Sequence, residues 1–229
     1  HDTTEILDGY LDAWRQENVD LDGVYSGFLG SADQVAIIKR LYAEYPHALR
    51  LVDPVMGDGG EIYATYTPEL CRAMGTLVDG ADALMPNLTE ASILTGRDYP
   101  GQDIDDAQVD EILGALLAAG AKNVVLKGID RGDGMIRNYV ASASTGVAGK
   151  QELAHAKLPF MTHGTGDAFA SALCGAVMAD TGRPLAEAAN IAGEFVRHAM
   201  ESTQYQPNHE ERGVSFELNL DELTALTRR

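Results

Sequence analysis

Short apolar stretches alternate with stretches of helical periodicity along most of this chain. LRLVDPV (49–55), ADALMPN (81–87) and KNVVLKG (122–128) carry apolar residues on both faces of an extended strand, which is typical of strands buried within a parallel sheet. Apolar residues recur at helical spacing in residues 3–18 and around 105–119. The alternation predicts an α/β fold of three layers, in which helices cover both faces of a central, mostly parallel sheet.

Two helix starts carry capping signals. Ser31 with Gln34 is a capping-box pattern for a helix that runs to about Tyr45. Thr67 followed by Pro68 combines a preferred cap with a residue suited to the first helical position. Both signals follow or precede predicted strands, as the alternating α/β pattern requires.

The last 100 residues predict an edge of the sheet and two long helices. MIRNYVAS (135–142) alternates in polarity, and together with residues 149–154 it predicts an antiparallel edge. Residues 165–180 and 184–203 follow with helical periodicity. LDGVYSG (21–27), near the other end of the chain, predicts one more short strand.

Composition limits the class of protein. With 229 residues, of which 45% are hydrophobic, the chain can bury one sizeable core, so we expect residues 1–229 to form a single domain. Its net charge of -18 would repel phosphate backbones and anionic membranes, which argues against a nucleic-acid or membrane partner. Cys71 and Cys174 give neither a disulfide framework nor a zinc spacing, and no apolar run reaches the ~20 residues that span a bilayer. We therefore expect a cytoplasmic protein.

Polar residues follow two of the apolar strands, at the edge where α/β sheets bind ligands. Asp53 ends LRLV directly, and a buried carboxylate there needs a partner such as a metal or a hydrogen-bond donor. Asp58 lies in MGDGG, which we expect to be a loop where aspartate is an ordinary turn residue. Asn87 and Glu90 allow two interpretations, namely ligand binding or the cap and first turn of a helix that starts near Thr89.

The stretch HGTGDAFASAL (163–173) places two glycines and an acid at the start of an apolar helix. One interpretation makes Thr165 a plain N-cap and Asp167 a favourable charge in the first turn. Two glycines beside a cap are costly in backbone entropy, however, unless the backbone must approach a ligand closely. Free amides at a helix start bind anions, and a neighbouring acid can accept the proton of an attacking hydroxyl. The pattern therefore predicts phosphoryl transfer, with Gly164, Thr165 and Gly166 holding the moving group and Asp167 as the base.

Five motifs together resemble a known family of kinases. They are, in order, YSGFLGSADQ (25–34), VDPVMGDGG (52–60), MPNLTEASILTG (85–96), VVLKG (124–128) and HGTGDAFASAL (163–173). This order resembles the pyridoxal kinase family of the ribokinase-like superfamily, whereas the GxxxxGK[ST] motif of P-loop enzymes does not occur. Within the superfamily, sugar kinases more often carry alanine at the position of Thr165, and hydroxymethylpyrimidine kinases usually carry cysteine at that of Asp167. Both positions favour a vitamin B6 kinase.

The resemblance implies ATP as co-substrate, Mg²⁺ as cofactor and a role for each matching residue. Asp167 would activate the 5′-hydroxyl of pyridoxal, pyridoxine or pyridoxamine, and the amides of residues 164–166 would form the anion hole for the transferred phosphoryl group. Glu90 and Asn87 would organise Mg²⁺ and its waters near the phosphates, with Asp53 behind them, which suits a cation that takes one or two carboxylates. A monovalent cation is a further expectation that the resemblance leaves open.

Three more positions carry an implied role beside a simpler interpretation. Lys127 matches a nucleotide-contacting position, and the alternative is a solvated lysine at the end of a strand. Phe28 falls where relatives place an aromatic residue against the pyridine ring, whereas general burial preferences favour a core phenylalanine. Asp58 joins the ATP-binding residues by resemblance, although its local pattern is that of a turn.

The family pattern also sets expectations for the ends and the assembly of the protein. It usually begins with a strand, a further strand–helix unit and a flap, before a helix entry that matches DTTEIL (2–7). We therefore expect this chain to lack the first strand–helix unit, and we expect a homodimer, as relatives form. Two alternatives remain beside a pyridoxal kinase: a hydroxymethylpyrimidine (phosphate) kinase, or a nucleotide-binding chain without catalytic activity.

Overall fold

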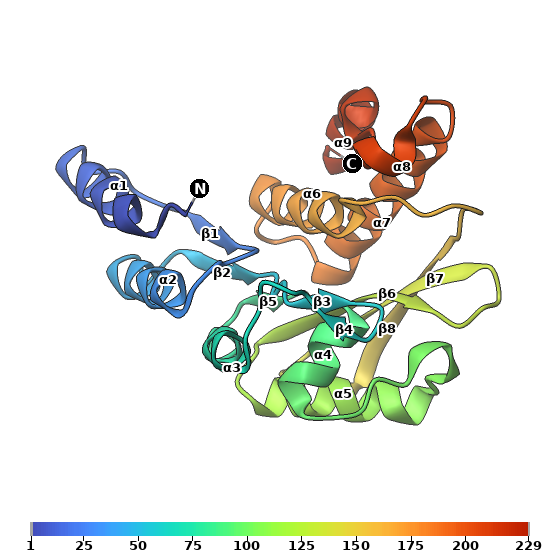
Figure 1. Ribbon diagram of the computed structural model, residues 1–229, viewed down its shortest axis with the longest axis horizontal. Helices are drawn as coiled ribbons and strands as arrows, with labels where there is room; N and C mark the ends of the chain where they lie inside the picture. Colours follow the sequence, from blue (N-terminus) through green and yellow to red (C-terminus); the bar gives the residue numbers. More distant parts are fainter. Residues whose placement is uncertain (1, 229) are drawn as a thin grey trace.

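The computed structural model describes residues 2–228 and is built on a six-stranded sheet (Figure 1). Along the sheet the strands are β1 (Gly23–Ser26), β2 (Leu49–Val52), β5 (Ala83–Leu84), β6 (Asn123–Asp130), β7 (Met135–Ser142) and β8 (Gly146–Ala156). The first four pair in parallel, and β7 and β8 add an antiparallel edge. The predicted parallel strands and the antiparallel edge are confirmed.

Helices cover both faces of the sheet. One face carries α1 (Thr4–Gln16), α2 (Ala32–Glu44), α3 (Pro68–Gly75), α4 (Leu88–Thr95) and α5 (Asp106–Ala118). The other carries α6 (Thr165–Ala179), α7 (Leu185–Thr203) and α9 (Leu220–Thr227). The short helices are α8 (His209–Arg212) and two 3-10 turns, η1 (Gly101–Asp103) and η2 (Phe216–Asn219). Figure 1 shows α3 to α5 below the sheet and α6 and α7 above it, so the predicted three-layer fold is confirmed.

The central strands bury side chains on both of their faces. Val52 and Leu126 belong to a core that α2 to α5 complete, whereas Leu51 and Val125 belong to a second core under α6 and α7. Successive residues of a strand point to opposite faces of its sheet. The apolar character of both faces therefore follows directly from burial between two helical layers.

The MGDGG stretch is more ordered than the predicted loop. β3 (Gly57–Asp58) and β4 (Glu61–Ile62) pair antiparallel in a small hairpin after β2. A side chain at Gly57 would overlap the carbonyl group of Glu61, so the close pairing requires glycine there. Strands of two residues are too short to show a period in the sequence.

Two predicted caps are present, one of them in part. The Ser31 hydroxyl accepts the amide of Gln34 at 3.2 Å, but the Gln34 side chain accepts the amide of Gly30 at 2.8 Å, not that of Ser31. The capping box is therefore half formed. Thr67 caps α3 as predicted.

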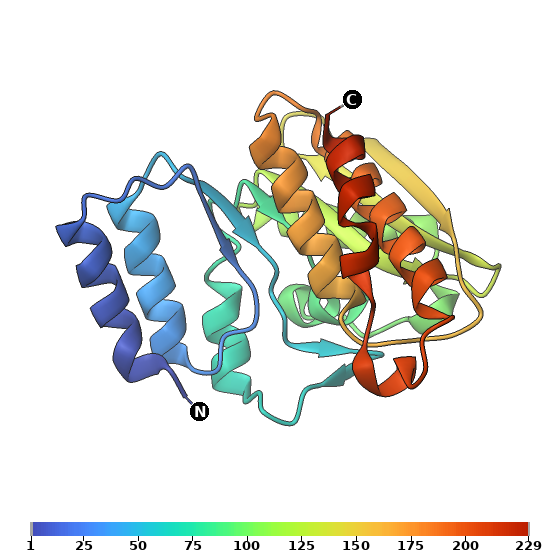
Figure 2. The same cartoon turned by 90° about the horizontal axis from the view of Figure 1, so that it is seen from above.

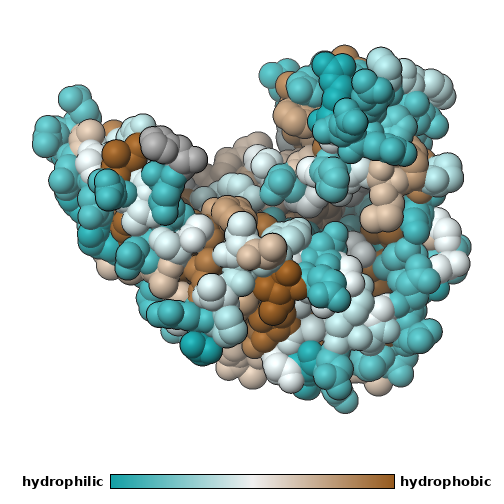
Figure 3. Space-filling model, in the orientation of Figure 1, coloured by the Kyte–Doolittle hydropathy of each residue, from teal (hydrophilic) through white to brown (hydrophobic). Residues whose placement is uncertain are grey.

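The molecule is hollowed on the side where the parallel strands end. In Figure 2 the last residues of β1, the β3–β4 hairpin and the start of α6 all lie along one edge. Figure 3 shows that face with a hollow between α1 and the helices α6 to α9. Among residues 2–228, no helix has the length and the apolar character needed to cross a bilayer.

The packing of α7 on β8 gives a stability prediction. A methyl group added at Gly193 would overlap the buried ring of His155. We expect Gly193→Ala to lower the free energy of unfolding by ~1–3 kcal/mol, the usual cost of overpacking a core. Gly175→Ala is the matched control, because a methyl group there meets nothing within 4 Å, and it should be neutral or stabilise α6 by up to ~1 kcal/mol. Urea denaturation that gave both variants the same stability would contradict this packing.

Candidate active site

The predicted site residues from three segments meet at the carboxyl ends of the parallel strands. Asp53 follows β2, Lys127 lies in β6, and Gly166 lies in the first turn of α6. The Lys127 Nζ atom donates to Asp53 Oδ1 at 2.5 Å, and it is 4.0 Å from the point that a Cβ atom on Gly166 would occupy. A cation, a carboxylate and a helix start are therefore neighbours.

The Asp53–Lys127 ion pair is almost completely buried. The side chains are 1% and 8% exposed, so the interpretation of Lys127 as a solvated strand-end lysine is wrong. Asp53 has the partner that a buried carboxylate needs, but its Oδ2 atom has no hydrogen-bond partner among the described residues. Burial raises the pKa of Asp53, and the charge of Lys127 opposes that rise.

Asn87 and Glu90 form a complete capping box at the start of α4. The Asn87 side chain accepts the amide of Glu90 at 2.9 Å, and Glu90 Oε2 accepts the amide of Asn87 at 2.7 Å. Glu90 Oε1 also accepts the amide of Met56 at 3.3 Å. The capping interpretation is thus confirmed. Burial raises the pKa of Glu90, while the charge of Lys127 and the two backbone amides that donate to the carboxylate oppose that rise.

The start of α6 differs from the predicted cap. The N-cap is Gly164, not Thr165, and its φ of +84° lies in the left-handed region that glycine adopts freely. Among residues 2–228, no side chain caps this helix. The amide groups of its first turn are therefore available to an anion. Asp167 lies in the same turn and is exposed, as a residue that meets a substrate must be.

Aromatic side chains stand at the same edge. Phe28, after β1, is 54% exposed and contacts Tyr66 edge-to-face with 5.5 Å between ring centroids. The interpretation of Phe28 as a core residue is therefore wrong. The Tyr66 hydroxyl donates to the carbonyl of Leu29 at 2.8 Å, which fixes the ring against which Phe28 rests.

Tyr25 is a site residue that sequence reasoning missed. It pairs in register with Leu51, which is buried on the α6 face of the sheet two positions before Asp53. It is 39% exposed, and burial followed by the charge of Asp53 raises its pKa. The only available signal was the position of Tyr25 next to Val24 in the predicted strand, because successive residues of a strand point to opposite faces.

Asp58 and Asn87 line a hollow of about 180 Å³ beside the hairpin. Asp58 is exposed and accepts the amide of Gly59 at 2.9 Å, as its turn pattern predicts. The other lining residues are Leu88, Thr89, Tyr99, Gly101, Gln102, Gly128 and Asp130. The structure thus brings Asp58 to the same edge as the other predicted ATP-binding residues.

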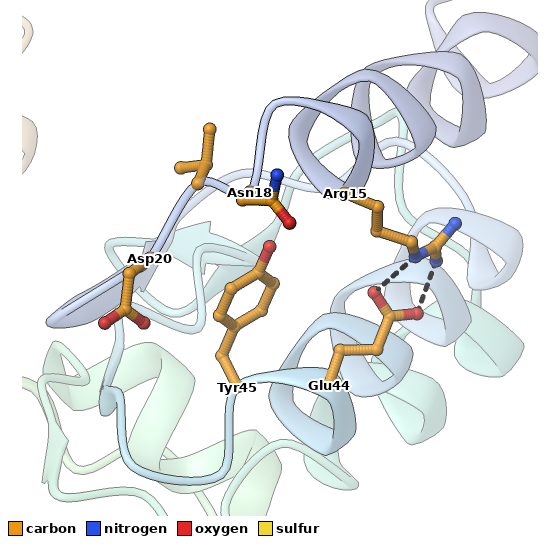
Figure 4. A pocket seen from close by; sticks show the side chains of 6 residues that line it. Arg15, Asn18, Asp20, Glu44 and Tyr45 are labelled. Carbon is orange, nitrogen blue, oxygen red and sulfur yellow. Dashed lines mark hydrogen bonds and ion pairs between the residues drawn. The ribbon is translucent and has the colours of Figure 1, made fainter.

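A larger hollow, of about 470 Å³, lies on the opposite side of the sheet's strands from the predicted site, at their amino ends (Figure 4). The end of α1, residues 18–20 and the end of α2 form it, and Arg15 is paired there with Glu44. Because these segments precede β1 and β2, the hollow is at the amino ends of the strands. It contains none of the predicted site residues.

The described residues could bind Mg²⁺ directly through one carboxylate oxygen. Asp53 Oδ2 is the buried carboxylate oxygen that lacks a partner among the described residues. Both oxygens of Glu90 already accept backbone amides, from Met56 and Asn87. Glu90 would therefore influence Mg²⁺ indirectly, by holding the backbone of these two residues and through water ligands of the ion. No group of three or more His, Cys, Asp or Glu side chains in residues 2–228 is arranged to hold a metal. One carboxylate with substrate phosphates and waters suffices for Mg²⁺.

Cys174 belongs to the core beneath α6 and α7. It is buried and unpaired two turns beyond Asp167. Burial raises the pKa of its thiol to about 12, so no thiolate forms at neutral pH.

Comparisons with known proteins agree with this arrangement. A family model described as phosphomethylpyrimidine kinase matches residues 3–215. A hydroxymethylpyrimidine/phosphomethylpyrimidine kinase of Bacillus subtilis is 29% identical over 88% of this chain and 71% of its own length. A pyridoxine/pyridoxal/pyridoxamine kinase of Bordetella avium is 30% identical over 80% of this chain and 61% of its own length. The chain thus spans 61% and 71% of these two relatives.

Solved structures show the same fold. Pyridoxal kinase from Lactobacillus plantarum superposes with a TM-score of 0.84 at 28% identity, covering 100% of this chain and 78% of that one. A Bacteroides thetaiotaomicron protein described as a candidate phosphomethylpyrimidine kinase, in a crystal form with pyridoxal, gives a TM-score of 0.89 at 27% identity, covering 98% and 78%. The match over residues 3–215, on a fold of the ribokinase-like type, shows that this chain belongs to the phosphomethylpyrimidine kinase family.

Proposed function

We propose that this chain transfers the γ-phosphoryl group of ATP to the 5′-hydroxymethyl group of pyridoxal, pyridoxine or pyridoxamine. One observation carries the proposal: Lys127, held by Asp53, lies beside the uncapped start of α6, whose first turn contains Asp167. A hydroxymethylpyrimidine kinase is the second candidate, supported by the family description and by the Bacillus subtilis relative.

The electrostatics of the site suit a phosphoryl group. Phosphoryl transfer depends mainly on positioning and on stabilising the charge of the moving group. The Lys127 ammonium and the free amides of 164–166 supply positive charge at one point of a protein whose net charge is -18. Mg²⁺, held by Asp53, would neutralise further phosphate charge when it binds.

Asp167 provides the proton acceptor. It accepts the proton of the acceptor hydroxyl as that oxygen forms its bond to phosphorus and the bond from phosphorus to the ADP oxygen breaks. Because Asp167 shares the first turn of α6 with Thr165 and Gly166, one helix start can orient both the nucleophile and the phosphoryl group.

Exposed aromatic side chains support an aromatic acceptor. Tyr25, Phe28 and Tyr63 are each between 39% and 54% exposed. Tyr25 lies near the carboxyl end of β1, Phe28 follows that strand, and Tyr63 follows β4 of the hairpin. Stacking on such side chains stabilises a flat heterocycle. Asp167 and the structure that contains pyridoxal support a B6 vitamer over a pyrimidine.

Product analysis distinguishes the two acceptors. The purified chain should convert pyridoxal, pyridoxine or pyridoxamine to the 5′-phosphate with a kcat/KM on the order of tenfold or more above that for hydroxymethylpyrimidine, because the acceptor pocket discriminates by shape and hydrogen bonding. Mass spectrometry of the products from parallel reactions gives the ratio. Phosphorylation of the pyrimidine alone would replace the first candidate with the second.

A further inference from the structure

Residues 209–214, near the end of the chain, contact residues 160–163, which lead into α6. The amide of Val214 donates to the carbonyl of His163 at 2.9 Å, and the Thr162 hydroxyl donates to the carbonyl of His209 at 2.9 Å. The rings of Phe160 and His209 also pack, with 4.9 Å between their centroids. Residues 160–163 are thus fixed at three points by residues that lie 47 to 51 positions further along the chain.

The same segment is itself anchored to α7. The amide of Ser215 donates to the Thr203 hydroxyl at 2.9 Å, and Thr203, which is fully buried, donates to the carbonyl of Ala199 at 2.6 Å. Val214 between these contacts is also buried. The long helix α7 therefore supports residues 209–215, and these in turn support the backbone before α6.

The fit between the two segments is close where they touch. Gly213 has a φ of +80°, and a Cβ atom on it would lie 3.0 Å from the carbonyl oxygen of His163. A Cβ atom on Gly164 would lie 3.6 Å from a methyl group of Val214. A displacement of residues 213–214 would therefore displace the backbone of residues 163–164, and the reverse also holds.

The contact matters because no side chain of the described residues caps α6. The direction of the amides in its first turn then depends on the backbone that enters Gly164, and the His163 carbonyl belongs to the peptide group directly before it. Figure 2 shows the turn that carries residues 205–214 at the edge where α6 starts.

We propose that residues 209–215, here called the C-terminal clamp, position the amides of 164–166 and Asp167 for phosphoryl transfer. This inference rests on the proposed function. Thr162, Gly213 and Val214 are positioning residues, which act through the backbone of His163 and Gly164 without touching the substrate.

Thr162 tests the clamp with a matched pair of variants. Thr162→Val removes the hydroxyl that donates to His209, whereas Thr162→Ser keeps it. We expect Thr162→Val to lower kcat by about tenfold or more while the acceptor KM changes much less, because small misplacements of catalytic groups reduce turnover strongly. Thr162→Ser should restore most of kcat. Equal kcat values for the two variants would overturn the role of this hydrogen bond.

Gly213 tests the clamp from the other side. Gly213→Ala should displace the His163 carbonyl, lower kcat by about tenfold or more and shift the amide NMR signals of Gly164 and Gly166. The control is Gly134→Ala, because Gly134 has nearly the same φ of +82° but nothing within 4 Å of an added methyl group. Gly134→Ala carries the backbone strain alone and should leave kcat and both signals unchanged.

The two readouts separate this inference from the proposed function. Shifted Gly164 and Gly166 signals with unchanged kcat in Gly213→Ala would overturn positioning. A wild-type chain that binds Mg-ATP but phosphorylates no acceptor would overturn the proposed function. In that case unchanged signals in Gly213→Ala would overturn the clamp as well, and shifted signals would establish its hold on the helix start.

Discussion

Asp167→Asn should lower kcat by about 10²–10⁴-fold, the usual contribution of a positioned general base, while the affinity for Mg-ATP changes little. Asparagine keeps the shape of aspartate but does not accept the proton of the acceptor hydroxyl. The Gly164 cap and the Lys127–Asp53 pair, which face the phosphates in our proposal, stay in place. Steady-state kinetics and calorimetric titration with an ATP analogue measure the two effects separately.

A second helix supplies the control for Asp167→Asn. Glu69 is an acid in the first turn of α3, as Asp167 is in α6, and it is exposed. Glu69→Gln removes a comparable favourable charge at a helix start, which stabilises by only ~0.3–1 kcal/mol, and it should leave kcat unchanged. An Asp167→Asn variant with the turnover of wild type would exclude Asp167 as the base.

Lys127→Met should destabilise the protein by ~3–5 kcal/mol, because it leaves the buried carboxylate of Asp53 without its partner. The pair is nearly inaccessible to water, with side chains 8% and 1% exposed, so solvent cannot replace the lost interaction. The loss should be smaller at low pH. Burial already raises the pKa of Asp53 above its value in the unfolded chain. Between these two pKa values the folded state binds more protons than the unfolded state. The stability of the variant is therefore highest at low pH and falls as pH rises through the folded-state pKa.

The double variant Asp53→Leu with Lys127→Met separates stability from catalysis. Replacing both members of a buried ion pair with apolar side chains is often neutral or stabilising, so urea denaturation should recover most of the stability lost in Lys127→Met. Turnover should nevertheless be absent in the double variant, because the positive charge beside Gly166 and the free carboxylate oxygen of Asp53 are both gone. A double variant as unstable as the single one would contradict the assignment of the loss to an unpaired carboxylate.

The local patterns of the sequence predicted the fold well. The apolar stretches LRLVDPV and KNVVLKG became β2 and β6 between two helical layers, because residues buried on both faces of a strand leave a signal within a few positions. The Thr67 cap was predicted for the same reason, since a cap and the amide it binds are three residues apart.

Contacts between distant residues account for what the sequence did not predict. Lys127 was open between two interpretations because its partner Asp53 is 74 residues away. One interpretation of the sequence made Thr165 the cap because threonine is a common N-cap, whereas the structure has Gly164, with its left-handed φ, at that position. The C-terminal clamp joins His163 to Val214 by backbone atoms alone, which carry no residue signature.

The most direct test of the account is ADP release by the purified chain with Mg-ATP, in the presence and absence of each B6 vitamer and of hydroxymethylpyrimidine. We predict ADP release that depends on pyridoxal, pyridoxine or pyridoxamine and that Asp167→Asn abolishes. ADP release that needs no acceptor, or none with any acceptor although ATP binds, would contradict the claim that this site transfers a phosphoryl group to a vitamer.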